Sequence, residues 1–300
     1  MGTRRNVRDI GDRKQLFIDE AFIASGANVS LTMNPPYQDH EPVFMPEMPW
    51  EYRIHPYCTV LKEGNTFRLW YLAYEWDPPP GVELPVTGTV QDTPDFWRHT
   101  VRRTCYAESN DGVHWTRPSL GLVERKGSRE NNIVPPAQDP ELGPVCMWGG
   151  TVFQDPTAPA DQLYKLWSEA KPADEARSKL WAFCSPDGLH WRPYGINPMP
   201  GHGDCLNVCF WDERIERYVG YSRLWTSDDA GDRYRAVRRL ASADFCQWEE
   251  TGIVIQADEV DLSLPVRRSR ESRQIMDWHG NCAFKVPGTL DVYIALPEVW

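Results

Sequence analysis

A turn of the form Ser-x-Asp-Gly, closed by a Trp, recurs in the sequence and constrains the fold more than any other feature. It reads SNDGVHW from Ser109 to Trp115 and SPDGLHW from Ser185 to Trp191, and a degenerate third copy reads SADFCQW from Ser242 to Trp248. The first two copies follow strand-forming residues, and an Asp-Gly pair between such runs is typical of a tight hairpin between antiparallel strands. The chain is therefore built from repeats.

Two further strands align before each turn. The apolar first strands share a pair of residues: Val60-Leu61, Val152-Phe153, Cys209-Phe210 and Ala283-Phe284. The aromatic second strands align at 66–73, 163–170, 217–224 and 290–297. Third strands end at the Ser of each turn, and fourth strands leave from its Trp. Four antiparallel strands that recur at roughly 60 to 90 residues, with hardly any helical periodicity, predict the blades of a β-propeller.

The connections between the strands are unequal. Turns between first and second strands are mostly short, as at 62–65 and 285–289, whereas the other connections are long, as at 75–102 and 118–145. In a meander the long connections all emerge on one side, which we call the loop face, and the short ones on the opposite, plain face. Loops on a rigid scaffold commonly carry function, so we expect a site on the loop face.

The repeats predict an all-β, five-bladed β-propeller of which this chain holds about three and a half blades. We expect a single propeller domain over 1–300, with blade 1 at about 52–118, blade 2 at about 144–194, blade 3 at about 203–256 and a partial blade 4 at about 274–300. Strands at 15–33 are expected to close the last blade. Because exposed sheet edges promote aggregation, we expect the protein to continue past Trp300.

The charge and composition of the chain argue against two classes of binding partner. The net charge of -11 makes a nucleic-acid backbone or an anionic membrane surface a poor partner. Residues 1–22 are charged and lack the apolar core of a secretory signal, so we expect a cytoplasmic protein, or a secreted one if a signal was removed. The 14 Trp exceed the ordinary need of a core, and some are expected to face a ligand.

No motif for a cofactor or a metal is present in the sequence. The 8 Cys are scattered through expected strands without a Cys-x-x-Cys pair or a His at zinc spacing, which predicts buried free thiols. A nucleotide-binding glycine loop, a Ser-His-Asp order and a His-Glu-x-x-His motif are all absent from the sequence. We therefore expect neither a cofactor nor a metal ion.

Polar residues precede the aligned first strands, where these strands begin beside the axis at the loop face. Counting back six positions from Leu61, Phe153, Phe210 and Phe284 leads to His55, Met147, Asp204 and Trp278. Carboxylates near these positions come from three blades, and we predict them as catalytic acid, base or nucleophile without assigning the roles: Glu51, Asp204 and Asp277. The predicted substrate-binding residues are His55, Trp148, Arg223, Trp225, Trp278 and His279.

Convergent carboxylates between aromatic walls suit glycoside cleavage, which needs a protonated acid and a second, ionised carboxylate. A guanidinium such as that of Arg223 can hold a substrate carboxylate or sugar hydroxyls, or orient Asp204. An Asp ahead of a strand serves equally well as a loop cap or as the partner of an Arg. The structural interpretation of these acids therefore stays open.

Several segments resemble a known superfamily, notably LFIDE at 16–20, PWE at 49–51, CYAESNDGVHW at 105–115 and GDCLNVCFWDE at 203–213. With these segments the chain resembles the five-bladed β-propeller glycoside hydrolases, the invertase-like and arabinanase-like families 32, 43 and 68, and in particular a bacterial family 32-like branch. The resemblance implies a propeller fold and a saccharide substrate. The invertase-like acidic motifs are not matched, because blade 1 offers Trp50-Glu51 and blade 3 offers Asp204-Cys205.

We predict a carbohydrate-active protein that acts on an oligosaccharide or polysaccharide, with neither nucleic acid nor membrane as partner. The expected activity is glycoside hydrolysis by paired carboxylates in a pocket at the propeller axis. The alternative is a non-catalytic carbohydrate-binding or structural propeller module. A third possibility, a lyase acting on an acidic polysaccharide, is favoured if Arg223 and the basic run Arg267–Arg273 face the pocket.

Overall fold

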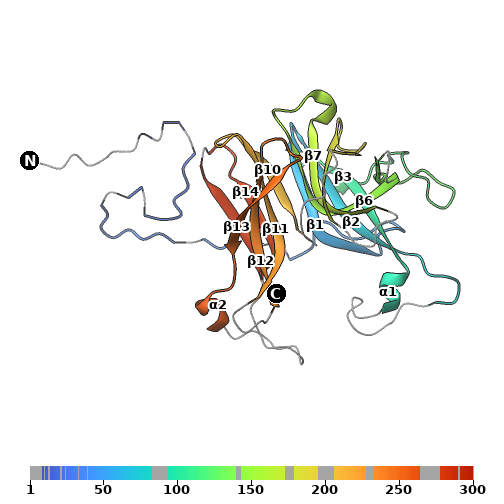
Figure 1. Ribbon diagram of the computed structural model, residues 1–300, viewed down its shortest axis with the longest axis horizontal. Coiled ribbons are helices and arrows are strands. Elements are labelled where there is room, and N and C mark those ends of the chain that lie inside the picture. Colours follow the sequence, from blue (N-terminus) through green and yellow to red (C-terminus); the bar gives the residue numbers. More distant parts are fainter. Residues whose placement is uncertain are drawn as a thin grey trace, which may run out of the picture.

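The computed structural model of the protein describes residues 9, 11–12, 14–20, 22–23, 25–32, 34–38, 40–82, 94–139, 143–172, 179–194, 206–227, 233–263, 278–289 and 291–299. Within these residues the regular structure is almost entirely β, in antiparallel sheets that follow chain order (Figure 1). The helical elements among them are short: α1 (Pro94–Arg98), the 3-10 turn η2 (Ala160–Gln162) and α2 (Glu259–Ser263). The predicted all-β class is confirmed, as a partial propeller.

Each sheet is one blade. Blade 1 consists of β1 (Arg53–Glu63), β2 (Thr66–Trp76), β3 (Thr100–Ser109) and β4 (Trp115–Thr116). Blade 2 has five strands, β5 (Ala137–Asp139), β6 (Gly143–Gln154), β7 (Tyr164–Pro172), β8 (Lys179–Ser185) and β9 (Arg192–Pro193). Blade 3 consists of β10 (Val208–Asp212), β11 (Arg217–Ser227), β12 (Arg233–Ser242) and β13 (Trp248–Ile255). Blade 4 is the hairpin of β14 (Trp278–Lys285) and β15 (Tyr293–Val299).

The strand register confirms the repeat in the first three blades and corrects it in the fourth. Trp70, Trp167 and Tyr221 occupy one column, each opposite the residue before the aligned apolar pair of its first strand. In blade 4, Phe284 pairs with Ile294, which is two residues later than the alignment predicts. The turn of blade 4 is longer than the alignment assumes, so β15 reaches further along the chain.

The Ser-x-Asp turns share one hydrogen-bond pattern. In the second copy the Asp187 carboxylate accepts from the backbone N–H groups of Leu189 at 2.8 Å and His190 at 2.9 Å, and the Ser185 hydroxyl accepts from the Gly188 N–H at 2.9 Å. The first copy repeats these bonds, and the third keeps those to its Asp. The turns therefore stabilise the hairpins, as expected of Asx-type turns.

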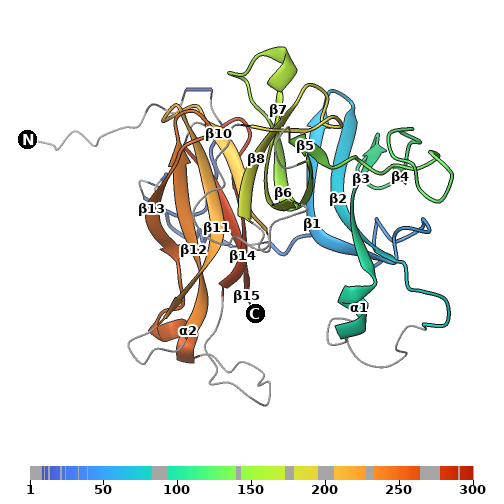
Figure 2. The ribbon, with the colours of Figure 1, turned by 45° about the vertical axis from the view of Figure 1, so that its right-hand side comes forward.

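The first strands β1, β6, β10 and β14 lie between the outer strands β4 and β13 (Figure 2). They surround a common cavity of about 470 Å³. Hydrogen bonds join three of them directly: the Thr59 hydroxyl donates to the Gly150 carbonyl at 3.3 Å, and the Thr151 hydroxyl donates to the Asn207 carbonyl at 2.8 Å. Gly150 is required here, because a Cβ would lie 2.3 Å from the Trp167 carbonyl oxygen. The sheets thus converge on one axis.

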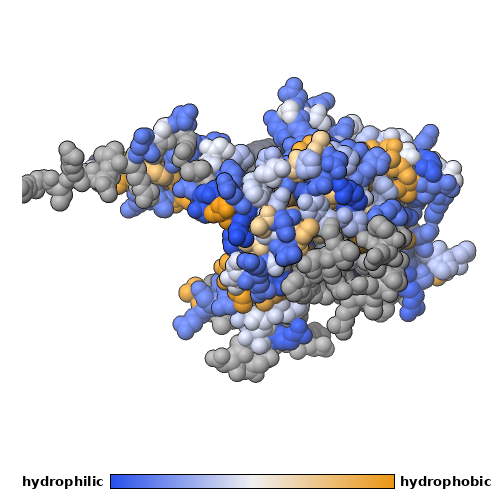
Figure 3. Space-filling model, turned by 45° about the horizontal axis from the view of Figure 1, so that its top comes forward, coloured by the Kyte–Doolittle hydropathy of each residue, from blue (hydrophilic) through white to orange (hydrophobic). Residues whose placement is uncertain are grey.

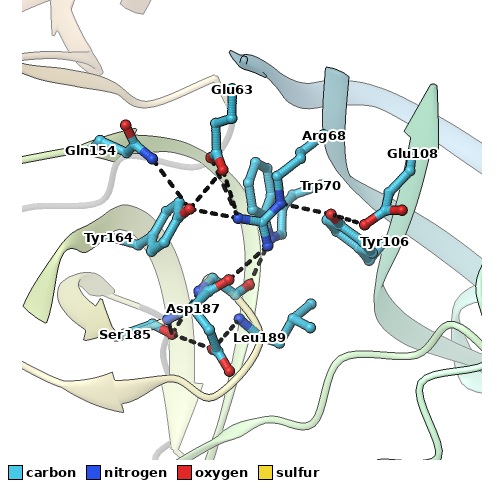
Figure 4. Close-up of polar contacts among 11 residues, drawn as sticks. Glu63, Arg68, Trp70, Tyr106, Glu108, Gln154, Tyr164, Ser185, Asp187 and Leu189 are labelled. Atoms are coloured by element: carbon cyan, nitrogen blue, oxygen red, sulfur yellow. Dashed lines mark hydrogen bonds and ion pairs between the residues drawn. The ribbon is translucent and has the colours of Figure 1, made fainter. Parts of the chain in front are cut away.

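The core lies between neighbouring blades. Between blades 1 and 2, Trp70 packs with rings from both sheets, and the guanidinium of Arg68 bridges the gap (Figure 4). Between blades 2 and 3, Trp167 and the fully buried Phe245 take the corresponding place.

The segment at 15–33 differs from its prediction. No strand is present among its described residues, and several of its apolar side chains are exposed, including Phe17 at 65%, Ile18 at 69% and Val29 at 73%. Figure 1 shows this segment running out from the sheets. A strand requires backbone partners, and the described residues of this segment pair with no strand of the sheets. Its role in closing the last blade stays a prediction.

On the face drawn in Figure 3, apolar residues are scattered among hydrophilic ones. The described cysteines are free thiols; Cys105, Cys184 and Cys209 are buried as expected, whereas Cys58 and Cys282 are exposed. Within the described ranges, the helices are too short and too polar for a membrane span.

Candidate functional site

The structure describes some of the predicted site residues and not others. Asp204 and Asp277 lie outside the described residues, and only the backbone of Trp148 is described. Their catalytic and binding roles therefore stay predictions. The side chains of Glu51, His55, Arg223, Trp225, Trp278 and His279 are described, and they fall into three separate environments.

Glu51 is buried in a network of protein donors. Its Oε1 accepts from the Tyr71 hydroxyl and from Arg117 Nε at 2.9 Å, and its Oε2 accepts from the backbone N–H groups of Glu47 at 2.9 Å and Met48 at 3.1 Å. Burial raises the pKa of the Tyr71 hydroxyl, which therefore remains a donor. With both oxygens occupied, this carboxylate anchors the segment before blade 1, and the geometry favours the structural interpretation of Glu51.

Aromatic side chains gather at the loop face of blade 1. The helix α1 lies in the long connection between β2 and β3 and buries Phe96 completely, while Trp76 stacks on that ring at 5.9 Å with an interplanar angle of 6°. Trp97 follows on α1, is 41% exposed and contacts Tyr74 at 5.6 Å. Tyr52, which is 37% exposed, packs against Phe96. We call these five residues the blade 1 aromatic surface.

The surface continues to the axis through His55. The His55 ring lies 5.7 Å from Tyr74 and 4.0 Å from Tyr57, measured between ring centroids. The Tyr57 hydroxyl lies 3.4 Å from His279 Nδ1, and His279 Nδ1 lies 3.1 Å from Glu298 Oε2. We call His55, Tyr57, His279 and Glu298 the axial cluster. It joins blade 1 to blade 4 and brings together the two histidines that were predicted to bind substrate.

The geometry of the axial cluster sets what it can do chemically. A proton on His279 Nδ1 that is donated to Glu298 makes Nε2 the basic nitrogen of the ring. Trp278 precedes this histidine, and its buried Nε1 has no acceptor among the residues that the structure describes, as is also true of Trp167, Trp181 and Trp191. The binding role of Trp278 therefore stays a prediction.

A separate group forms at the loop-face end of blade 3. Trp225 is 41% exposed, and the guanidinium carbons of three arginines lie over its ring: Arg235 at 4.6 Å, Arg233 at 5.1 Å and Arg223 at 5.9 Å from the centroid. We call these four residues the Trp225 platform. It contains both blade 3 residues that were predicted to bind substrate, and the two further arginines come from β12.

The sequence prediction missed Tyr57 and Glu298. Tyr57 stands two positions after His55 on the same strand, a spacing that places both on one face and gave a usable signal. Glu298 pairs with Gly280, beside His279, but the two-residue error in the blade 4 alignment put it beyond the expected strand. The prediction also left blade 2 without an acid, yet Glu169 in β7 is 2% exposed and pairs in register with Trp148.

Within the described part of the chain, no group of three His, Cys, Asp or Glu side chains is arranged to hold a metal ion. At the axial cluster, the described carboxylate that contacts a histidine is that of Glu298. The other two predicted acids, Asp204 and Asp277, lie outside the described residues.

Comparison with known proteins gives distant similarity. No family model matches the chain. Two uncharacterized proteins, from two strains of Mycobacterium tuberculosis, are each 25% identical over 173 residues, which cover 55% of this chain and 45% of the relative. The match thus spans less than half the length of these curated relatives.

Three of the solved structures that match part of the chain are the following. A GH130-family glycoside hydrolase that targets β-1,2 mannosidic linkages has a TM-score of 0.41 at 13% identity, over 69% of this chain and 52% of that one. The Bombyx mori GH32 β-fructofuranosidase has a TM-score of 0.44 at 11% identity, over 81% and 42%. An N-acetylgalactosamine deacetylase from F. plautii has a TM-score of 0.38 at 14% identity, over 65% and 49%. Similarity at this level does not establish a function.

Proposed function

We propose that the protein is carbohydrate-active and that a saccharide binds at the loop face, along the blade 1 aromatic surface toward the axial cluster. The observation that carries this proposal is the continuous path of rings from the exposed Trp97 through Tyr74 and His55 to the axis. Aromatic faces match the apolar faces of sugar rings, and polar groups at one end of such a surface fix the orientation of the ligand.

The reaction we propose is hydrolysis of a glycosidic bond. This reaction requires one protonated carboxyl group at the leaving oxygen and one ionised carboxylate. Glu298 lies in the axial cluster, and Asp277 immediately precedes Trp278 in the sequence. We propose that Asp204 and Asp277 supply the carboxyl chemistry, with His279 and Glu298 orienting the substrate or tuning one of these acids.

A non-catalytic carbohydrate-binding module is the second candidate. The observation in its favour is Glu51, the predicted acid of blade 1, whose oxygens are both engaged by protein donors. A propeller that kept the aromatic surface but used this acid for folding would bind saccharides without cleaving them.

The two candidates differ in turnover. Release of reducing sugar and calorimetric binding should be measured on a panel of oligosaccharides, including β-1,2-mannosides and β-fructofuranosides. For a hydrolase, we expect turnover that Asp204→Asn or Asp277→Asn abolishes while binding is retained. Glu213→Gln serves as the control carboxylate, because Glu213 pairs with Lys285 at the plain face. Binding without turnover would identify a module, and the absence of both would refute the proposal.

The aromatic surface can be tested independently of the chemistry. Trp97→Ala should weaken binding about tenfold or more, which corresponds to the stacking energy of one aromatic side chain on a ligand. Tyr37→Ala is the matched control, because Tyr37 is 91% exposed and lies on the segment before blade 1. Equal affinity of the Trp97 variant and the wild type would contradict this placement of the saccharide.

A further inference from the structure

The Trp225 platform is built by strand register. Trp225 of β11 pairs with Arg235 of β12, and Ser227 pairs with Arg233. Directly opposite residues in an antiparallel pair share one face, as do residues two apart on one strand. The register therefore places Arg223, Trp225, Arg233 and Arg235 on the same face of this two-stranded ribbon. The arrangement belongs to the sheet, so its geometry does not depend on a loop conformation.

The exposure of the platform increases toward the loop face. Arg223 is 4% exposed, Arg235 is half-buried, and Arg233 and Trp225 are exposed. Positive groups thus continue from the interior of the sheet to its tip along one aromatic ring. The chain as a whole carries a net charge of -11, and Arg233 is the exposed positive group of the platform.

A ligand that fits this geometry is a sugar ring that carries an anionic group. Guanidinium groups bind carboxylates and phosphate-like esters through paired, charge-assisted hydrogen bonds. The exposed part of the Trp225 indole offers a face on which a pyranose can stack.

We propose that the Trp225 platform is a subsite for an anionic substituent, so that the saccharide bound by this protein is an acidic one. This inference rests on the proposed function and deepens it by naming the substrate class. The anion is either the carboxylate of a uronic acid or a sulfate or phosphate ester on a neutral sugar. Both sources share the same recognition by Arg233 and Arg235.

The test compares saccharides that differ in charge but share a backbone. Binding of tetragalacturonate should be measured beside its methyl-esterified form, which keeps the sugar rings and loses the negative charges. A sulfated carrageenan oligosaccharide and its desulfated form make the corresponding pair for an ester. We expect the charged member of one pair to bind at least about tenfold more tightly than its neutral counterpart, and the preference to fall as salt rises.

Variants at Arg233 test whether the Trp225 platform causes the preference for charged saccharides. Arg233→Gln should remove most of the charge preference, and Arg233→Lys should restore only part of it, because an ammonium keeps the charge without the planar fork. Arg217→Gln is the matched control, since Arg217 is exposed on the same strand β11 at its plain-face end. Circular dichroism and thermal melts of all three variants establish that each is folded.

The outcomes separate this inference from the proposed function. Preference for tetragalacturonate that depends on Arg233 assigns a uronate, and the same result for the carrageenan pair assigns an ester. Equal binding of charged and neutral members, or an unchanged preference in Arg233→Gln, overturns the inference. If neutral saccharides bind and Trp97→Ala weakens them, the proposed function survives that result. If no saccharide binds at all, both fail.

Discussion

The two joints between neighbouring blades place equivalent residues of the repeat in different environments. At the joint of blades 1 and 2, Arg68 donates to the Tyr106 hydroxyl, the Tyr164 hydroxyl and the Asp187 carbonyl, each at 2.6 Å, and pairs with Glu63 at 3.1 Å (Figure 4). At the joint of blades 2 and 3, the equivalent residue is a lysine. Lys165 Nζ lies 3.5 Å from the centroid of the Tyr194 ring and 5.4 Å from that of Phe245.

The turn residue that faces each joint explains the difference. Gly188 offers its carbonyl oxygen to Trp70 Nε1 at 2.7 Å, and a Cβ at Gly188 would lie 2.7 Å from Trp70 Cζ2. In the degenerate third turn the same position holds Phe245. Its ring is completely buried and fills the joint. There Trp167 Nε1 has no acceptor among the described residues, and the Trp167 ring stacks on Trp248 at 5.1 Å. Hydrogen bonds thus hold the joint beside Gly188, whereas apolar packing predominates beside Phe245, with Lys165 as a buried charged group within it.

The largest expected effect is that of Gly188→Ala. The new methyl group would meet the Trp70 ring, and the backbone φ of +79° disfavours any side chain, so we expect a loss of about 3 to 5 kcal/mol in the free energy of unfolding. Urea denaturation measures it. Gly112→Ala in the first turn has nearly the same φ, +78°, but its nearest neighbour lies at 3.8 Å, so only about 1 to 2 kcal/mol is expected. Equal losses would show that strain alone, and not the joint, explains the effect.

The second effect is that of Arg68→Met. Removal of the guanidinium leaves Glu63, the Asp187 carbonyl and two tyrosine hydroxyls without their shared donor, and we expect a loss of about 2 to 4 kcal/mol. Chemical denaturation of the variant beside Arg217→Met, an exposed arginine, checks this value. A loss no greater than that of the control would mean that the polar joint adds nothing to stability.

The matching substitution at the other joint, Lys165→Met, should cost nothing or stabilise the protein. Burial lowers the pKa of Lys165, since the surrounding rings compensate its charge only in part. Because the unfolded state binds the proton more readily, stability of the wild type should rise with pH as the pH passes from the lowered pKa toward 10.5. Lys165→Met should lose this dependence. Destabilisation by more than about 1 kcal/mol would refute the apolar description of the joint.

The smallest effect concerns acid stability. Backbone and side-chain hydrogen bonds within its turn lower the pKa of Asp187 to about 2 despite partial burial, from an ordinary value of 3.8. The unfolded state therefore binds more protons between these values, so stability is present above pH 3.8 and is lost as the pH falls toward 2. We expect Asp187→Asn to remove about 1 kcal/mol of this acid-sensitive stability, a value discounted for exposure. Thermal melts at pH 2 to 5, beside Asp12→Asn at an exposed position before blade 1, measure it.

Much of the scaffold was predictable from the sequence because each blade repeats the same pattern of strands and turns. The Asp-Gly turns and the column of Trp70, Trp167 and Tyr221 fix hairpins and register locally, and the structure confirms both. The blade 4 register was predicted wrongly because the alignment assumed a shorter turn between β14 and β15 than the one present. The segment at 15–33 was predicted as strands from local propensity, which cannot supply the backbone partner that a strand needs.

The candidate site was less predictable because it depends on contacts between blades. His55 and His279 were identified by counting back from the apolar pairs, and the structure brings them together through Tyr57. Glu51 shows the limit of such counting: its position in the sequence suggested an acid beside the axis, whereas Arg117, 66 residues later, engages it in a buried ion pair. Sequence spacing cannot reveal such a distant partner.

The hydrogen bonds that tie Thr59, Gly150, Thr151 and Asn207 together have a further consequence. They fasten blades 1, 2 and 3 to one another beside the axis, which opposes sliding of these three sheets relative to one another. Lengthening or shortening a peripheral connection then leaves the central frame undisturbed. With such a frame, the loops of the loop face can change and alter ligand specificity, while the hydrogen bonds beside the axis stay the same.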